Sequence, residues 1–352
     1  MPARHIALAV LVAVLWGVNF LAIHASLEQF PPLFLVALRF ALIAVPTLLF
    51  VPRPRVHTRW LIGYGLGFGT LQFLFLYLGM AAGFPTGLAS LVLQASAPFT
   101  VVLGAALLGE RLGRRHVVGI VIATAGLTTV GLAYGSTAPV GPFLLVLLGA
   151  LGWALGNLSS RQARADKPLN LVLWMSVVPP LPMLALSLVV EGPAEIGHSL
   201  ATSWSADAVP AWAGLAYTIV LGTLLGSGIW VWLMARHPAG AVAPFSMLVP
   251  VVGIATAWLV LGERPSWLEL AGGVLVVGGV LWASRAGAGG SARARGAAQT
   301  RADAREDRGI REAPGTREVP GAPEELVTPE AAATRKEDRR GEPATASAAG
   351  TP

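Results

Sequence analysis

Long apolar stretches alternate with short polar segments over the first 284 residues of this chain. A helix of about twenty apolar residues crosses the roughly 30 Å hydrocarbon core of a bilayer, and a chain within lipid must satisfy its own backbone hydrogen bonds. The period-two alternation of transmembrane β-strands is absent. The pattern therefore predicts an all-α membrane protein with ten transmembrane helices and with the lipid bilayer as a partner. The expected spans are residues 6–23, 32–51, 60–82, 86–108, 117–134, 142–160, 169–190, 210–234, 240–261 and 267–284.

A four-residue motif occurs twice, 153 residues apart, and each copy closes an apolar stretch. Leu108-Gly109-Glu110-Arg111 ends the fourth stretch, and Leu261-Gly262-Glu263-Arg264 ends the ninth. One proline and two glycines accompany each copy at nearly matching distances: Pro98, Gly119 and Gly126 in the first, Pro250, Gly272 and Gly279 in the second. Because five spans separate the copies, we expect them at opposite membrane faces. The chain is therefore predicted to contain two inverted five-helix repeats, residues 6–134 and 142–284, an arrangement typical of secondary transporters.

Charged residues make up only 12% of the chain and are unevenly distributed. Eleven Lys and Arg residues fall on one side of the predicted spans, and only Arg264 falls in a loop on the other. Since basic residues accumulate in cytoplasmic loops, both termini are expected in the cytoplasm and the protein in the inner membrane. The first stretch reaches spanning length at Ile23 without a small-residue cleavage site, so a retained span is expected and not a signal peptide.

The last segment, residues 285–352, differs in composition from the rest. It contains twelve of the 25 Lys and Arg residues and eleven of the 19 Asp and Glu residues, with almost no large apolar side chains. Such a segment cannot bury a core, so a disordered cytoplasmic tail is predicted. Its nearly balanced charge gives no reason to expect nucleic acid as a partner. The chain has no cysteine and no metal or cofactor motif, so neither a metal nor a cofactor is expected.

Arg39 is a charged residue that lies inside a predicted span. Polar side chains inside membrane spans are costly and usually face a cavity or another helix. Arg39 lies seven residues after Pro32, about 10 Å into the second span at 1.5 Å per residue. Its planar guanidinium could hold a substrate carboxylate through two hydrogen bonds. Alternatively, it extends to the outer headgroups or pairs with Glu28, and the sequence leaves both hypotheses open.

Further polar and aromatic residues within the spans could line a substrate pathway. Asn19 and Asn157 lie in the opening spans of the two repeats, each about one helical turn after a tryptophan, Trp16 or Trp153. The other predicted pathway residues are Gln72, Gln94, Tyr217, Trp230 and Ser246. Such side chains suit a small polar or zwitterionic solute. Polar residues also join membrane helices to one another, so both roles stay open for each residue.

The repeated prolines and glutamates are expected to shape the helices. Pro98 and Pro250 are predicted to bend the fourth and ninth spans, because each frees a carbonyl four residues earlier. The motif residues are predicted to mark helix ends or a gate: Glu110 and Glu263 lie at helix ends beside Arg111 and Arg264, where a hydrated ion pair or a gate contact is expected. No Asp or Glu lies in the middle of a span, so the sequence leaves ion coupling open.

Together these residues resemble the EamA family of the drug/metabolite transporter superfamily. The resemblance covers residues 6–284 and is carried by both Gly-Glu-Arg copies, by Trp16-Gly17-Val18-Asn19-Phe20, by Arg39-Phe40, by residues 87–94 with Pro98, and by residues 243–244 and 248–253. The string that ends at Gln94 is similar to the O-acetylserine/cysteine exporter branch. The resemblance implies a carrier, not an enzyme, that takes a small-molecule substrate and exports amino-acid-like metabolites by alternating access.

Three other functions are considered as alternatives. A drug or metabolite carrier of broader specificity differs only in its substrates. A membrane-embedded enzyme is disfavoured because the motifs H-E-x-x-H and G-x-S-x-G, any cysteine, and an acid at mid-membrane are absent. A sensor that signals through the tail is the third alternative, and the sequence leaves a homodimer open.

Overall fold

The structure is a computed structural model that describes residues 1–283. All regular structure in these residues is helical. Nine helical segments among them are long and apolar enough to cross a membrane, and a shorter apolar helix, Trp267–Ala283, occupies the place of the tenth predicted span. The predicted all-α, multi-pass membrane fold is confirmed. The predicted disordered tail, residues 285–352, lies outside the described residues.

The first repeat contains three continuous and two interrupted spans. The continuous helices are α1 (Ala3–Leu27), α2 (Pro32–Phe50) and α7 (Arg114–Gly135). The third span consists of α3 (Thr58–Tyr64), the π-helical segment η1 (Gly65–Leu71) and α4 (Gln72–Ala81). The fourth span consists of α5 (Thr86–Val92), the 3-10 turn η2 (Leu93–Ala95) and α6 (Ser96–Leu108).

The second repeat has interruptions of the same kind at the same places. It opens with α8 (Gly141–Ala163). The eighth span consists of α12 (Val209–Tyr217), the π-helical segment η4 (Thr218–Gly226) and α13 (Ser227–Arg236). The ninth span consists of α14 (Ala239–Val242), the 3-10 segment η5 (Ala243–Met247) and α15 (Leu248–Leu261). In both repeats, the third span therefore contains a π-helical segment and the fourth a 3-10 turn.

The seventh span differs from the single helix predicted for residues 169–190. It consists of α9 (Pro168–Met175) and α10 (Pro180–Val190), which are separated by four residues. Pro179 and Pro180 lack the amide hydrogen that a continuous helix needs, so α9 ends before them. The segment after α10, expected from the sequence to be a loop, contains α11 (Pro193–Thr202) and the 3-10 turn η3 (Ala206–Ala208).

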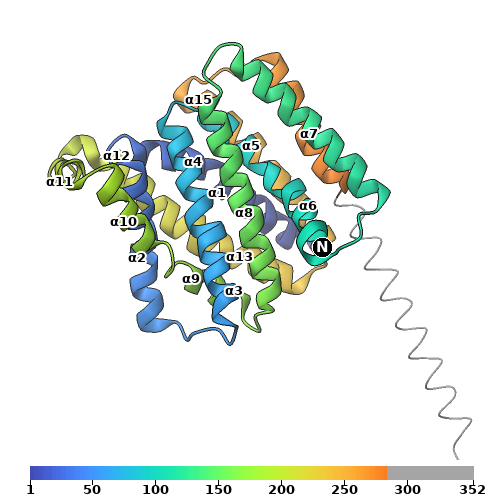
Figure 1. Ribbon diagram of the computed structural model, residues 1–352, viewed down its shortest axis with the longest axis horizontal. Helices are drawn as coiled ribbons and strands as arrows, with labels where there is room; N and C mark the ends of the chain where they lie inside the picture. Colours follow the sequence, from blue (N-terminus) through green and yellow to red (C-terminus); the bar gives the residue numbers. More distant parts are fainter. Residues whose placement is uncertain (284–352) are drawn as a thin grey trace, which may run out of the picture. The chain divides into compact units, whose positions relative to one another are not determined.

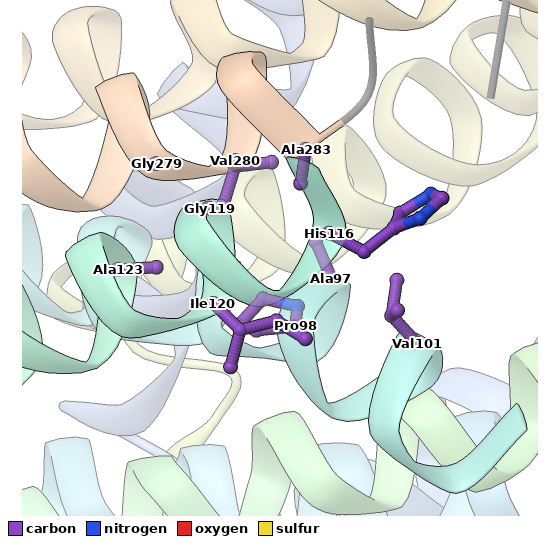
Figure 2. A pocket seen from close by; sticks show the side chains of 10 residues that line it. All are labelled: Ala97, Pro98, Val101, His116, Gly119, Ile120, Ala123, Gly279, Val280 and Ala283. Atoms are coloured by element: carbon purple, nitrogen blue, oxygen red, sulfur yellow. The ribbon is translucent and has the colours of Figure 1, made fainter. Parts of the chain in front are cut away.

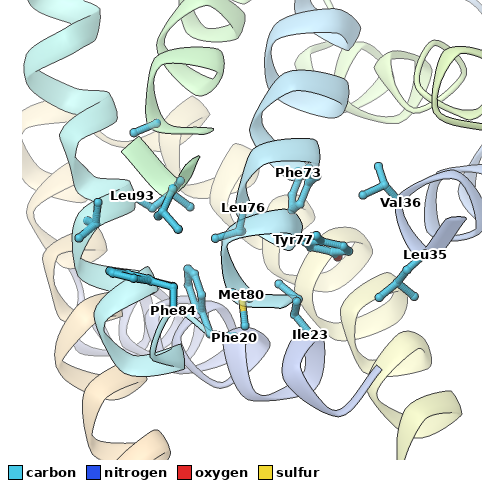
Figure 3. Packing of buried hydrophobic residues seen from close by; sticks show 14 of the residues in the cluster. Phe20, Ile23, Leu35, Val36, Phe73, Leu76, Tyr77, Met80, Phe84 and Leu93 are labelled. Carbon is cyan, nitrogen blue, oxygen red and sulfur yellow. The ribbon is translucent and has the colours of Figure 1, made fainter. Parts of the chain in front are cut away.

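The opening helix of each repeat packs against the other repeat. Helix α1 contacts α12, η4 and α15 of the second repeat, and α8 contacts α3, η1, α4 and α6 of the first. The two repeats therefore share one core. Figure 3 shows a part of it, where Phe20 and Ile23 of α1 lie close to Leu76 and Met80 of α4.

The closing helices of the two repeats lie side by side, α7 against Trp267–Ala283, shown as the green and orange helices of Figure 1. The two helices contact each other at the four glycines that accompany the repeated motif, Gly119, Gly126, Gly272 and Gly279. A Cβ atom on Gly119 would lie 2.6 Å from the Gly279 carbonyl oxygen, and a Cβ atom on Gly126 would lie 2.6 Å from the Gly272 carbonyl oxygen. Only glycine permits backbones to approach this closely.

The two ends of the bundle are packed differently. We call them the Glu263 end, where the fourth span begins and α15 finishes, and the Glu110 end, where the ninth span begins and α6 finishes. All residues from 86 to 96, which open the fourth span, are buried. Among residues 240–249, which correspond to residues 87–96 at the interval of 153, only Val242 and Val249 are buried. The bundle is therefore tightly packed around the fourth span at the Glu263 end and looser around the ninth span at the Glu110 end.

Candidate functional site

Arg39 lies in α2 with only 4% of its surface exposed. Its Nη1 donates a hydrogen bond to the Tyr77 hydroxyl at 2.9 Å, and its Nη2 donates to Thr223 Oγ1 at 3.0 Å. The guanidinium carbon lies 4.1 Å from the centre of the Phe73 ring, which is a cation–π contact. The side chain is thus held inside the bundle, between the second, third and eighth spans, and does not extend to the bundle surface.

The Arg39 guanidinium has no acidic partner among the described residues. Glu28, the partner considered from the sequence, pairs instead with His24 at 3.5 Å, and the other ion pair of the described chain joins Arg161 to Glu110. Guanidinium groups stay protonated in proteins, and a buried charge without a counter-charge is costly. Arg39 Nε also lacks a hydrogen-bond partner there. The site therefore offers a positive charge and a free donor to an anion.

Thr223 was not predicted as a site residue, and it takes its position from the π-helical segment η4. Its Oγ1 donates to the Thr218 carbonyl five residues earlier at 2.9 Å. In η1, Thr70 Oγ1 donates to the Gly65 carbonyl, also five residues earlier, at 3.2 Å. The tripeptides Gly69-Thr70-Leu71 and Gly222-Thr223-Leu224 are 153 residues apart, the same interval as the Gly-Glu-Arg copies. This second internal repeat is the sequence signal that could have identified Thr223.

Helix α1 brings Asn19 next to the same π-helical segment. A Cβ atom on Gly222 would lie 2.6 Å from Asn19 Oδ1, so the amide lies against the residue that precedes Thr223. Trp16 Nε1 donates to the Gly222 carbonyl at 2.9 Å. We call Asn19, Arg39, Phe73, Tyr77 and Thr223 the Arg39 cluster.

Two more predicted pathway residues join α1 to the eighth span. The Tyr217 hydroxyl donates to the Leu15 carbonyl at 3.1 Å. The Trp230 ring lies 5.2 Å from the Trp16 ring, measured between centroids. Both residues therefore border the α1 side of the Arg39 cluster, although neither contacts Arg39 itself through a hydrogen bond or ring contact that we observe in the described chain.

Several buried polar atoms near the Arg39 cluster lack hydrogen-bond partners within the described residues. They are Asn19 Oδ1, Arg39 Nε, Gln72 Oε1 and Thr218 Oγ1. Gln72 directly precedes Phe73, and the Thr218 carbonyl binds the Thr223 hydroxyl. Buried polar groups are nearly always paired, so unpaired ones mark a place where a polar ligand can bind. The set includes one cationic donor together with carbonyl and hydroxyl acceptors.

A second group of predicted residues joins the fourth and ninth spans. Gln94 Nε2 donates to the Ser246 carbonyl at 3.3 Å. Pro250, four residues after Ser246, has no amide hydrogen with which to bond that carbonyl, so Gln94 takes the place of the missing helix bond. Pro98 likewise lies four residues after Gln94 and has no amide hydrogen with which to bond the Gln94 carbonyl. The 3-10 turns η2 and η5 precede Pro98 and Pro250.

The α8 residues Trp153 and Asn157 make no direct ring contact or hydrogen bond with the Arg39 cluster in the described chain, although Phe68 links the Trp153 ring to the Phe73 ring of the cluster. Asn157 Nδ2 donates to Thr100 Oγ1 of α6 at 3.2 Å. The Trp153 ring lies 5.9 Å from the Phe68 ring of η1. The two asparagines that open the repeats are therefore not equivalent in their contacts, because Asn19 meets a π-helical segment and Asn157 meets an α-helix.

In the described chain the repeated glutamates form no ion pair with the arginines that follow them, Arg111 and Arg264, so of the two expected contacts the ion pair with these neighbours is not seen. Each follows a left-handed glycine, Gly109 with φ 67° and Gly262 with φ 69°, and this turn directs the glutamate back toward the bundle. The Glu263 carboxylate accepts hydrogen bonds from the backbone amides of Thr86 at 2.7 Å and Gly87 at 2.8 Å. The Glu110 carboxylate pairs with Arg161 at the end of α8.

An apolar pocket of about 140 Å³ lies beside Pro98, between α6, α7 and the last described helix (Figure 2). Its lining includes Gly119, Gly279 and Val280, and His116 contributes the ring nitrogens in this lining. Of the predicted site residues, only Pro98 lines it. The pocket is therefore separate from the Arg39 cluster.

Comparison with known proteins gives consistent results. The model of the EamA-like transporter family matches residues 3–132 and 141–285. The chain is 42% identical over 279 residues to a "probable amino-acid metabolite efflux pump" of Salmonella typhimurium strain LT2, and 41% identical over 280 residues to a protein of that name in Escherichia coli K12. A "probable terminal-alkyne amino-acid exporter" of Streptantibioticus cattleyicolor is 28% identical over 288 residues. Each alignment covers 78% of this chain and 92% of the relative.

Proposed function

The chain belongs to the EamA-like transporter family, and from this premise we propose that it exports small amino-acid-like metabolites, with O-acetylserine and cysteine as the first substrates to test. Its relatives at 42% and 41% identity carry the name of amino-acid metabolite efflux pump, and a third relative is named for an amino-acid exporter. Such solutes share a carboxylate and an ammonium group on a small skeleton. A site for them needs a cation and several neutral acceptors.

The observation that carries this proposal is the buried Arg39 guanidinium without a counter-charge. A substrate carboxylate would accept from Nε and from one of the Nη groups, in the planar two-bond geometry that guanidinium favours. The substrate ammonium would donate to neutral acceptors, for which Asn19 Oδ1 and Thr218 Oγ1 are unpaired. Because no acidic side chain pairs with Arg39 in the described chain, a substrate carboxylate can supply the counter-charge that the guanidinium lacks, and a simple cation cannot.

We also propose the orientation and the transport cycle. The Glu110 end would face the cytoplasm in the inner membrane, because Arg111, Arg114, Arg115 and Arg161 gather there. Two inverted repeats can exchange conformations about their pseudo-two-fold axis and so open one site alternately to each side. The looser packing at the Glu110 end supports a cytoplasm-open conformation, in which the substrate enters from within.

Efflux from proteoliposomes loaded with labelled cysteine or O-acetylserine tests the proposal. Arg39→Gln removes the charge, and Arg39→Lys keeps the charge but loses the planar pair of donors; we expect initial efflux to fall by roughly tenfold or more in the first and by less in the second. Arg59→Gln is the matched control, since Arg59 is exposed and stacks on Trp60. The wild-type protein should discriminate against the decarboxylated amine of each substrate.

Two results would contradict the proposal in different ways. Undiminished efflux of both carboxylated substrates by Arg39→Gln would remove the role of Arg39. Equal efflux of structurally unrelated drugs by the wild-type protein would favour the carrier of broader specificity.

A further inference from the structure

The unequal packing of the two ends raises the question of what holds one end closed. At the Glu263 end the fourth span begins among buried residues, and Ala89 there has 0% of its surface exposed. At the Glu110 end Ala241, which like Ala89 lies nine residues before a proline, is exposed, although the next residue, Val242, is buried. The two inverted repeats thus differ in conformation although they are built alike. The contacts that differ between them identify the gate.

The Glu263 carboxylate crosses from the second repeat to the first at the closed end. Its two oxygens accept from the Thr86 and Gly87 amides at 2.7 and 2.8 Å. These amides open the span Thr86–Leu108 and have no partner within the helix, and the positive end of the helix dipole favours a carboxylate there. A helix end held this way is fixed to α15.

The mirror contact at the Glu110 end is absent among the described residues. By the interval of 153 residues, Glu110 corresponds to Glu263, and Gly240 at the start of the ninth span corresponds to Gly87. In the described chain the Glu110 carboxylate instead pairs with Arg161. Within the part of the chain that the structure describes, the fourth and ninth spans are therefore joined by a carboxylate at one end only.

The second and seventh spans, in contrast, are joined at both ends. At the Glu263 end the Glu191 carboxylate accepts from the amides of Leu33 at 2.6 Å and Phe34 at 2.9 Å. At the Glu110 end Trp174 Nε1 donates to the Val51 carbonyl at 2.9 Å, and Asn170 Nδ2 donates to the Pro52 carbonyl at 3.1 Å. In this structure the pair is tied at both ends. The ends of the fourth and ninth spans are then the parts free to move.

We propose that Glu263 is the latch that closes the Glu263 end, and that Glu110 is its mirror latch for the opposite state. In that state Glu110 leaves Arg161 and binds the amides that open the ninth span, while Glu263 releases Thr86 and Gly87. Only one latch is engaged at a time, so the bundle never opens at both ends. The inference rests on the proposed transport function only in assuming that the protein has two such states.

The symmetry between the repeats also predicts which residue Glu263 binds after it releases Thr86 and Gly87. Arg161 lies eight residues after Trp153 in α8, and His24 lies eight residues after Trp16 in α1. Since α1 packs on α15 as α8 packs on α6, His24 occupies the position from which Arg161 holds Glu110. Released Glu263 therefore meets His24, whose side chain pairs with Glu28 in the structure described here.

Single cysteines can report which end is open, because the chain has none of its own. Ala89→Cys and Ala241→Cys are matched reporters, one at each end. In full-length protein in nanodiscs, where a soluble maleimide reaches both ends, Ala241→Cys should react fast and Ala89→Cys slowly. Adding Glu263→Gln should raise the Ala89→Cys rate by roughly tenfold and lower the Ala241→Cys rate, since charged hydrogen bonds are lost from one state only.

A second variant tests the latch independently in case Glu263→Gln misfolds. His24→Arg leaves the latch intact and strengthens the partner of its released form, so it should shift the two rates in the same directions. Glu195→Gln, in an exposed carboxylate of α11 at the same end of the bundle, is the control and should change neither rate. Unchanged rates in both Glu263→Gln and His24→Arg, or a rise at both reporters together, would overturn the latch.

The labelling result is independent of substrate recognition. If the rates shift as expected while Arg39→Gln still exports carboxylated solutes, the latch stands and the role of Arg39 fails. If the rates do not shift but Arg39→Gln abolishes efflux, the latch alone fails.

Discussion

Replacing Thr223 by valine should destabilise the protein more than the same change at Thr70. Both threonines are buried, both lie in π-helical segments, and both bond a carbonyl five residues earlier. Only Thr223 also accepts a hydrogen bond from Arg39. Thr→Val keeps the shape of the side chain and removes the hydroxyl, so the pair isolates the contact with the guanidinium.

The expected magnitudes follow from what each substitution leaves unpaired. Thr70→Val loses one hydrogen bond, worth about 0.5–1.5 kcal/mol of unfolding free energy. Thr223→Val loses the equivalent bond and also strands a buried, charged donor, which adds about 1–3 kcal/mol. A loss of 1 kcal/mol lowers the Tm by about 2–4 °C in chains of about 150–250 residues and by less in a longer chain, so Thr223→Val should lower the Tm by about one to a few degrees more than Thr70→Val.

Thermal unfolding of the purified protein in detergent measures the difference, and Thr223→Ser supplies the rescue because it retains the hydroxyl. A saturating concentration of a carboxylated substrate should stabilise Thr70→Val as it does the wild type, and stabilise Thr223→Val less. Equal losses of Tm in the two valine variants would refute the assignment of Thr223 as the residue that holds Arg39.

Two further predictions concern packing and the tail. Gly279→Ala should lower the Tm, because the added Cβ atom would lie 2.6 Å from both the Ala123 amide nitrogen and the Gly119 carbonyl oxygen. Gly278→Ala is the control in the same unfolding assay: its Cβ atom would meet nothing within 4 Å, so the Tm should be unchanged or slightly higher. Removal of residues 285–352 should leave efflux from proteoliposomes intact, and loss of efflux with normal membrane insertion would favour the sensor instead.

The hydropathy pattern predicts this fold well because lipid leaves a chain few choices. Each apolar run must be a helix, and the interval of 153 residues defines the two repeats. The hydropathy pattern does not predict where a helix is interrupted or begins because of local backbone chemistry. The adjacent prolines at 179 and 180 divide a run that is uniformly apolar, and α11 forms in a segment too polar to suggest a span.

The surroundings of Arg39 could not be predicted, because its partners are distant in sequence. Arg39 is 38 residues from Tyr77 and 184 from Thr223. The polar residues of a span show which side chains need partners, but the partner is chosen by how the helices pack. For the same reason the adjacent Arg111 and Arg264 are poor guides to the contacts of Glu110 and Glu263. Those contacts are made with other helices, by Glu263 with the amides of Thr86 and Gly87 and by Glu110 with Arg161.

The glycine crossing between the two closing helices has a consequence for the history of the chain. Gly119 faces Gly279 and Gly126 faces Gly272, so each repeat contributes the same two positions to the contact. An interface in which both sides present the same residues is the interface of a two-fold symmetric dimer. A single five-helix unit, paired antiparallel with a second copy about a two-fold axis, could have formed it before any gene fusion. Each half therefore restricts which substitutions the other can accept, although they lie far apart in sequence.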